Sequence, residues 1–276
     1  MTIPKTYKLF IGGKFPRTES GRILEVRGPK GELFANASRA SRKDFRNSVV
    51  AARKAQSGWA GASAYLKGQI LYRIAEMLDG RSAQFIDELG AEGRKDSKAD
   101  VASAIDLLVH YAGWSDKFQA LFSTVNPTAT PHFNFSVPEP LGVVGVVAPS
   151  DGSLTGLVSA LAPVLVGGNA SVVLSSAGLR SAISFAEVLA TSDVPAGVVN
   201  ILTGLQTELM PEFAKHRDVN GLLLCSGDPV LAREAELEAV DNLKRVAAKP
   251  DGALAASPYA ILDFQEIKTT WHPVGV

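Results

Sequence analysis

The chain of 276 residues contains one cysteine, Cys225, and therefore one thiol that could act as a nucleophile. A thiolate attacks a carbonyl carbon far more readily than a hydroxyl does at neutral pH. Cys225 ends the run LLLC, whose leucines predict a buried strand. Because apolar burial raises the pKa of a thiol, we interpret Cys225 as a structural residue, with a nucleophile as the alternative.

The histidines and the cysteine form no recognisable metal-binding or acid–base group. The four histidines, His110, His132, His216 and His272, are scattered, and no pair has the spacing of metal ligands. A single cysteine also excludes a Cys-x-x-Cys motif. We predict no metal site and no catalytic histidine.

The charge balance excludes two classes of partner. Lys plus Arg and Asp plus Glu each number 28, so the net charge is zero, whereas nucleic-acid binders and proteins that dock on anionic membranes carry a basic excess. The longest apolar stretch, residues 154–173, is broken by Pro163 and Gly167 and does not predict a membrane span. The first ten residues lack the pattern of a signal peptide, so we expect a cytoplasmic protein.

Alternating apolar patterns in the second half of the chain predict the fold. Residues 141–148, LGVVGVVA, are typical of a central parallel strand that is covered on both faces. The patterns that follow predict a helix at 154–166, a strand at 171–174, a helix at 181–191, a strand at 198–202, a helix at 207–215, a strand at 222–225 and a helix from Pro229. This order indicates an α/β protein with a doubly wound, Rossmann-like parallel sheet.

The flanking segments have other patterns. Residues 42–120 are helical, with one apolar stripe that ends at Asp79-Gly80 and a further helix expected at 103–121. Apolar runs on both sides of Gly12-Gly13 predict a hairpin between residues 7 and 26. The C-terminal segment starts as a loop, residues 249–258, and ends in a β-branched run that is typical of an edge strand.

Several phrases resemble the aldehyde dehydrogenase superfamily. They are YKLFIGGKF (7–15), PEPLGVVGVVAP (138–149), GGNASVV (167–173), VPAGVVNILTG (194–204) and LKRV (243–246). The resemblance covers most of residues 7–247 and implies a cofactor-binding domain at 1–248, including the N-terminal arm and helices. Residues 249–276 would then form a linker and a C-terminal oligomerisation strand.

The end of the chain also resembles this superfamily. FNFSV (133–137) is similar to one strand of its bridging hairpin, expected here at about 131–138, and IKTTW (267–271) is similar to its oligomerisation strand. In the superfamily a whole catalytic domain lies between LKRV and that strand, whereas only residues 247–266 lie there in this chain. The resemblance therefore implies that the catalytic domain is missing, as in the degenerate second module of two-module aldehyde dehydrogenases.

The positions that match the superfamily's catalytic groups carry residue types that cannot perform the same chemistry. The asparagine that stabilises the oxyanion falls on Asp151, whose carboxylate would repel a developing negative charge. We expect Asp151 to cap the following helix instead. The general base falls on Lys249, and an ammonium group cannot deprotonate water at neutral pH. No catalytic residue is predicted.

The cofactor site implied by the resemblance is also degenerate. Leu174 and Ala177 stand where the superfamily has its polar ribose contacts, a loss that would weaken binding about a hundredfold or more. The pyrophosphate loop resembles residues 227–233, in which we expect Asp228 to cap a helix that begins at Pro229. NAD or NADP binding thus remains possible but weakened, and its candidate residues are Pro149, Asp151, Ser176, Gly204 and Gly227.

These observations favour a non-catalytic member of the superfamily that acts as an assembly or regulatory partner. Strand edges that are retained without the catalytic domain predict a homo-oligomer, or a hetero-oligomer with a full-length aldehyde dehydrogenase. One alternative is an NAD(P)-binding module or sensor. Another is an active dehydrogenase that uses Cys225 or a nucleophile from a partner.

Overall fold

Strands and helices alternate through the second half of the chain, as the sequence predicts. The computed structural model describes residues 4–249 and 256–275. The alternating elements are β6 (Val143–Val147), α6 (Leu154–Val166), β7 (Ala170–Ser175), α7 (Leu179–Ala190), β8 (Val199–Thr203), α8 (Gln206–Lys215), β9 (Gly221–Leu224) and α9 (Pro229–Ala239). Their observed and predicted ends agree closely, because each element carries a strong apolar pattern of its own.

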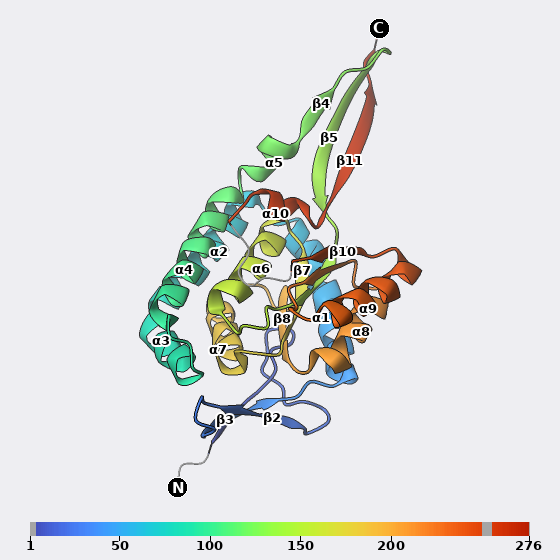
Figure 1. Cartoon of the computed structure of the whole chain (residues 1–276). Coiled ribbons are helices and arrows are strands. Elements are labelled where there is room, and N and C mark those ends of the chain that lie inside the picture. The colour runs from blue at the N-terminus through green and yellow to red at the C-terminus, as the bar shows by residue number, and fades with distance from the viewer. Residues whose placement is uncertain (1–3, 250–255, 276) are drawn as a thin grey trace.

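These strands form a five-stranded parallel sheet in the order β10-β9-β6-β7-β8, which confirms the doubly wound α/β fold (Figure 1). The edge strand β10 (Arg245–Ala248) was not predicted. It has only four partly exposed residues, and its conformation depends on pairing with β9, where Val246 lies opposite Leu222. The strand order reverses between β6 and β9, the place where ligands usually bind in such sheets.

Helices fill most of the chain before the sheet. They are α1 (Arg42–Ala60), α2 (Ala64–Asp79), α3 (Ser82–Ala91), α4 (Ser97–Trp114) and α5 (Phe118–Phe122). Gly80 is the C-cap of α2, as predicted. The single helix expected at 103–121 is wrong at both ends. The helix starts earlier, at Ser97, and its C-cap is Ser115, whose N–H bonds the carbonyl of Ala112 at 3.3 Å in a tighter turn.

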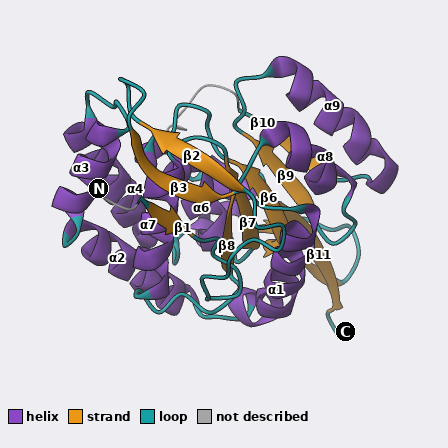
Figure 2. Ribbon diagram, turned by 90° about the horizontal axis from the view of Figure 1, so that it is seen from below, coloured by secondary structure: helices purple, strands orange, loops and turns teal. Residues whose placement is uncertain are grey.

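Successive side chains of the central strands enter two different cores. Val144 and Val146 of β6 pack with residues of α2, α4, α6 and α7. Val143 and Val147 face the opposite way and pack with residues of α1, α8 and α9. Figure 2 shows these two helical layers on either side of the sheet. Burial on both faces explains why β6 is apolar at every position.

The prediction of an N-terminal hairpin is only partly confirmed. Gly12 and Gly13, both at positive φ, form a tight turn in which Ile11 and Lys14 exchange hydrogen bonds of 2.9 and 3.1 Å. However, the flanking strands β1 (Lys5–Tyr7) and β2 (Ile23–Arg27) do not pair with each other. Both pair with β3 (Leu33–Ser38), in the order β1-β3-β2, because this strand offers both of its edges.

A three-stranded antiparallel sheet projects from the body (Figure 1). It consists of β4 (Thr124–Asn126), β5 (His132–Pro140) and β11 (Gln265–Pro273), and we call it the β-arm. The predicted partnership between the bridging strand and the C-terminal run is confirmed. β5 and β11 pair along nine residues, from Gln265 opposite Pro140 to Pro273 opposite His132.

The segment before β11 is fastened to the body of the protein. The short helix α10 (Tyr259–Leu262) packs near α6, and Phe264 is buried. The buried amide of Asn169 accepts the N–H of Gly142 at 2.8 Å and donates to the carbonyl of Phe264 at 3.0 Å. Most of the loop predicted at 249–258 lies outside the described residues. Among the helices described, none is both long and apolar enough to cross a bilayer.

Candidate functional site

The carboxyl edge of the parallel sheet collects all five residues predicted for the cofactor site. Pro149 and Asp151 follow β6, Ser176 follows β7, Gly204 follows β8 and Gly227 follows β9. Because β6 and β9 are adjacent, the first and last of these loops flank the point where the strand order reverses. The fold therefore brings the predicted residues to one edge, and the individual contacts decide what they can do there.

Asp151 does not cap α6, which corrects the prediction. The N-cap is Ser153, whose hydroxyl accepts the N–H of Gly156 at 3.0 Å. Asp151 lies before this cap, where its Oδ1 accepts the N–H of Ser153 at 3.0 Å. Its Oδ2 lies 3.4 Å from Nη2 of Arg94, a residue of the loop between α3 and α4. The carboxylate at the position of the oxyanion donor is thus held in an ion pair.

The N-terminus of α6 is occupied by a second carboxylate, that of Asp100 on α4. Asp100 is buried, and its two oxygens accept the N–H groups of Leu154 at 3.0 Å and Thr155 at 2.9 Å. The same carboxylate lies 2.9 Å from Nε of Arg94. These contacts satisfy the first free backbone donors of the helix, so they are not available to bind an oxyanion.

Cys225 is fully buried directly after β9, as expected for a structural thiol. Burial raises the pKa of this thiol to about 12, and the positive charge of Lys249 opposes the increase only in part. The thiol is therefore protonated at neutral pH, and an uncharged thiol is a poor nucleophile.

Lys249, at the expected position of the general base, follows β10. Its backbone N–H bonds the carbonyl of Leu224 at 2.7 Å, which extends the pairing of β10 with β9. Its ammonium group forms an ion pair with the carboxylate of Asp263. This contact fastens the segment before β11 to the sheet, and it gives Lys249 a structural partner.

The N-terminus of α9, where the resemblance puts the pyrophosphate, is filled by the chain itself. Asp228 caps the helix as predicted, since its Oδ1 accepts the N–H groups of Val230 at 2.9 Å and Leu231 at 3.2 Å. Pro229 has no N–H to offer. A carboxylate thus takes the position and the donors that a phosphate would need. The residues of this loop do not fit a dinucleotide pyrophosphate.

The glycines and the serine of the predicted site have different surroundings. Gly204 is buried, and a Cβ there would lie 3.1 Å from a methyl carbon of Leu209, so this glycine serves close packing. Gly227 is exposed and has open space around it. The hydroxyl of Ser176 is buried and has no hydrogen-bond partner within the described chain. Among the five predicted residues, Ser176 thus keeps an unused polar side-chain group at this edge.

A polar strip at the carboxyl edge was missed by the sequence analysis. The side chain of Gln206, the first residue of α8, accepts the hydroxyl of Ser226 at 2.7 Å and reaches Ser150 at 3.5 Å. The hydroxyl of Ser226 in turn accepts the N–H of Asp228 at 3.2 Å. Three loops are joined in this way. The only signal in the sequence is that each residue follows a predicted strand.

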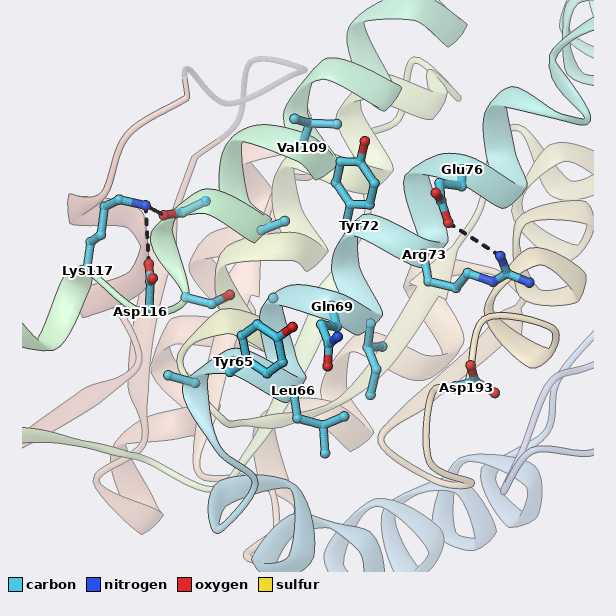
Figure 3. Close-up of a pocket in the computed structure, with 16 residues that line it drawn as sticks. Tyr65, Leu66, Gln69, Tyr72, Arg73, Glu76, Val109, Asp116, Lys117 and Asp193 are labelled. Atoms are coloured by element: carbon cyan, nitrogen blue, oxygen red, sulfur yellow. Dashed lines mark hydrogen bonds and ion pairs between the residues drawn. The ribbon is translucent and has the colours of Figure 1, made fainter.

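Hollows also lie on the protein away from these contacts. One, of about 380 Å³, lies between α8 and α9 and is lined by Met210, Leu231 and Ala235. Another, of about 820 Å³, lies between α2 and α4 and is drawn in Figure 3. In residues 4–249 and 256–275, no cluster of His, Cys, Asp and Glu could hold a metal ion.

Comparison with known proteins agrees with this architecture. Residues 15–268 match the sequence profile of the aldehyde dehydrogenase family. Cytosolic 10-formyltetrahydrofolate dehydrogenase of Xenopus laevis is 30% identical over 263 residues, which cover 91% of this chain and 29% of that protein. Mitochondrial benzaldehyde dehydrogenase of Antirrhinum majus is 29% identical over 273 residues, covering 94% of this chain and 49% of that protein.

Solved structures agree as well. A putative aldehyde dehydrogenase from Burkholderia cenocepacia superposes with a TM-score of 0.81 at 27% identity, covering 88% of this chain and 50% of that one. HpcC from Thermus thermophilus gives a TM-score of 0.83 at 25% identity, covering 88% and 48%. The chain thus spans half or less of the length of these relatives. On the profile match and the shared fold, the chain belongs to the aldehyde dehydrogenase family.

Proposed function

We propose that this chain is a non-catalytic member of the aldehyde dehydrogenase family that acts by assembling with other subunits. The observation that carries the proposal is the ion pair between Asp151 and Arg94 at 3.4 Å. It puts a carboxylate, fixed by a cation, where the family resemblance expects a neutral amide donor. The buried thiol of Cys225, with a pKa of about 12, supports the same conclusion.

The β-arm supplies the means of assembly. Among the described strands, β11 pairs only with β5 and β4 pairs only with β5, so β11 and β4 are the two edges of this sheet. Four large apolar side chains of the β-arm are well exposed: Val125, Phe133, Ile267 and Trp271. An open strand edge beside apolar side chains fits a strand from another subunit. The partner is a second copy of this chain or a full-length aldehyde dehydrogenase.

Assembly is tested by size-exclusion chromatography with light scattering. We expect the chain to form oligomers, alone or when co-expressed with a full-length aldehyde dehydrogenase from the same source. Replacing Ile267 and Trp271 with Glu should dissociate them. Val50→Glu, on the exposed face of α1, is the matched control and should change nothing. A wild-type chain that stays monomeric and captures no dehydrogenase contradicts the proposal.

The absence of catalysis is tested separately with the purified chain, a panel of aliphatic and aromatic aldehydes, and NAD or NADP. We expect no aldehyde-dependent NADH or NADPH formation. Turnover that disappears in Cys225→Ser would instead establish an active dehydrogenase, the alternative that needs a reactive thiol.

A second candidate, a nucleotide-binding module, is favoured by the hollow of about 380 Å³ between α8 and α9. Its size and the apolar side chains of Met210 and Leu231 suit a planar base, and Glu234 and Glu238 also line it. The cap formed by Asp228 argues against the attached phosphates. Calorimetric titration with NAD, NADP and AMP decides: a dissociation constant below about 100 μM supports a nucleotide module, and no binding up to about millimolar ligand rejects it.

A further inference from the structure

Two acids at the end of α3 share one guanidinium group. Glu88 and Glu92, the C-cap of α3, are four residues apart and therefore lie on the same side of the helix. Arg180, the second residue of α7, acts on both: its Nε lies 3.4 Å from the Glu88 carboxylate, and its charge also acts on Glu92. Helices α3 and α7 pack side by side (Figure 1). Two carboxyl groups thus face a single cation between these helices.

Each of the two acids has a buried oxygen that is not used. Glu88 is 2% exposed, and its Oε1 accepts the side-chain amide of Gln84 at 2.9 Å. Oε2 of Glu88 and Oε1 of Glu92 are buried and have no hydrogen-bond partner among residues 4–249 and 256–275. A buried acceptor without a donor is costly. One proton bound by this pair supplies the missing donor, because it turns one carboxylate into an O–H group that can bond to the other.

No second cation neutralises the pair. Arg94, the other arginine near the end of α3, already forms ion pairs of 2.9 to 3.4 Å with three acids: Asp96, Asp100 and Asp151. Glu88 and Glu92 therefore depend on Arg180. If both are ionised, one negative charge between α3 and α7 is not balanced, and one bound proton removes it.

The other charged side chains around the pair leave this balance unchanged. On α7, Glu187 is paired with Arg81 at 2.7 Å. The turn between β2 and β3 touches the loop after α3 at Pro29. Further charged residues of this turn, of α3 and of the start of α4 are exposed and therefore solvated: Lys30, Glu32, Asp87, Lys95 and Lys98.

The pair also contacts the start of α7. The N-cap of α7 is Gly178, at φ +57, which has no side chain to cap the helix. The carboxyl group of Glu92 is approached by the backbone N–H of Arg180 instead. Gly178 packs on the loop after β6, since a Cβ on Gly152 would lie 2.7 Å from its backbone nitrogen. The same loop before α7 contains Ser176, whose hydroxyl is buried at the carboxyl edge of the sheet.

We propose that Glu88 and Glu92 form a proton-operated latch that holds the loop before α7 closed. With one proton shared between them, the pair carries a single negative charge, which Arg180 balances, and Glu92 donates its proton to the free oxygen of Glu88. When this proton is lost to water, two carboxylates repel each other beside one guanidinium, and water must enter to solvate them. The loop around Gly178 then opens and exposes Ser176.

The surroundings of Glu92 set the direction of the switch. Its burial and the charge of Glu88 raise the pKa of Glu92 from the ordinary 4.5 to about 7, and Arg180 opposes this increase. The closed latch therefore binds the proton more strongly than the open one does. The stabilisation of the closed form is complete below the ordinary pKa and is lost as the pH rises to about 7. The latch is closed in mildly acidic solution and opens toward neutral and alkaline pH.

The proton is observed by NMR of the chain labelled with ¹³C at its glutamate carboxyl carbons. We expect one resonance to titrate near neutral pH, well above the others, and to be missing in Glu92→Gln. In Glu88→Gln, Arg180 faces a single acid, so the same resonance should titrate at lower pH. A wild-type spectrum in which no glutamate titrates above about pH 6 overturns the proposal, and this readout uses the unaltered chain.

Opening of the loop is measured by hydrogen–deuterium exchange at a series of pH values, corrected for the intrinsic pH dependence of exchange. We expect the opening constant at residues 176–182 to rise about tenfold between pH 6 and pH 8 and to level off above. Glu92→Gln, which is neutral and keeps a donor, should stay closed throughout. Glu76→Gln, at an exposed position on α2, is the matched control and should follow the wild type. Identical profiles for the wild type and Glu92→Gln, or a rise that extends equally to β7, would contradict a local latch.

Discussion

The Nε atom of Arg94 lies 2.9 Å from the buried carboxylate of Asp100, so a loop residue after α3 neutralises an acid that caps α6. The same guanidinium also approaches Asp151 at 3.4 Å. Through these contacts one cation fixes the N-terminus of α6 and the loop after β6. The charged side chains at this part of the sheet edge therefore hold the loop and the helix in place.

Replacing Arg94 with Met should destabilise the protein by about 2–4 kcal/mol, because the carboxylate of Asp100 would stay buried without its cation. The free energy of unfolding in urea measures the effect. Arg73→Met, which removes an exposed pair with Glu76, should cost less than about 1 kcal/mol. Equal losses in the two variants would show that Arg94 is no more important than a surface cation.

Replacing Asp151 with Asn restores the amide type but should not create dehydrogenase activity. The donors at the start of α6 remain bound to Asp100, and the thiol of Cys225 remains buried. NADH formation with aldehyde and NAD measures this, and we expect none above background. Turnover in this variant would mean that a single substitution had disabled the site.

Cys225 should resist alkylation in the folded protein. Because burial raises the pKa of its thiol to about 12, almost no thiolate forms at neutral pH. Iodoacetamide labelling followed by mass spectrometry should show one modified cysteine in urea and negligible modification without it. Rapid labelling of the native chain would show that the thiol is accessible and ionised.

Glu92→Gln should stabilise the protein above neutral pH. Burial raises the pKa of Glu92 to about 7, helped by the nearby Glu88 and opposed by Arg180. Since the folded carboxyl binds its proton up to a higher pH than the unfolded one does, wild-type stability falls as pH rises from the ordinary glutamate pKa to about 7. The variant should lack this decline and gain on the order of 1–3 kcal/mol at alkaline pH.

Urea unfolding of both proteins at several pH values between acid and mildly alkaline conditions checks this dependence. Glu76→Gln, at an exposed position on α2, should leave the pH profile unchanged. Parallel profiles for wild type and Glu92→Gln would contradict the prediction.

Asn169→Ala should cost about 2–4 kcal/mol, because it leaves the N–H of Gly142 and the carbonyl of Phe264 buried without their partner. The same unfolding measurement applies. Asn47→Ala, at an exposed position on α1, should change the stability by less than about 0.5 kcal/mol. A small effect at Asn169 would show that the C-terminal segment is held by other contacts.

The sequence by itself determined the alternation of strands and helices from β6 to α9. Runs such as LGVVGVVA combine apolar character, length and a following turn, and these are local properties. The cap formed by Asp228 and the burial of Cys225 were predictable for the same reason. Each depends on neighbouring residues in the chain.

Only the tertiary structure decided the features that join distant residues. β3 lies between two strands that the sequence had paired with each other, and β10 exists because β9 offers an edge. Ser153, and not Asp151, is the N-cap of α6. Arg94 pairs with both Asp151 and Asp100, although Arg94 and Asp100 lie more than forty positions before Asp151 in the chain. Hydrogen bonds and ion pairs of this kind depend on where the folded backbone places each group, and local periodicity carries no information about that placement.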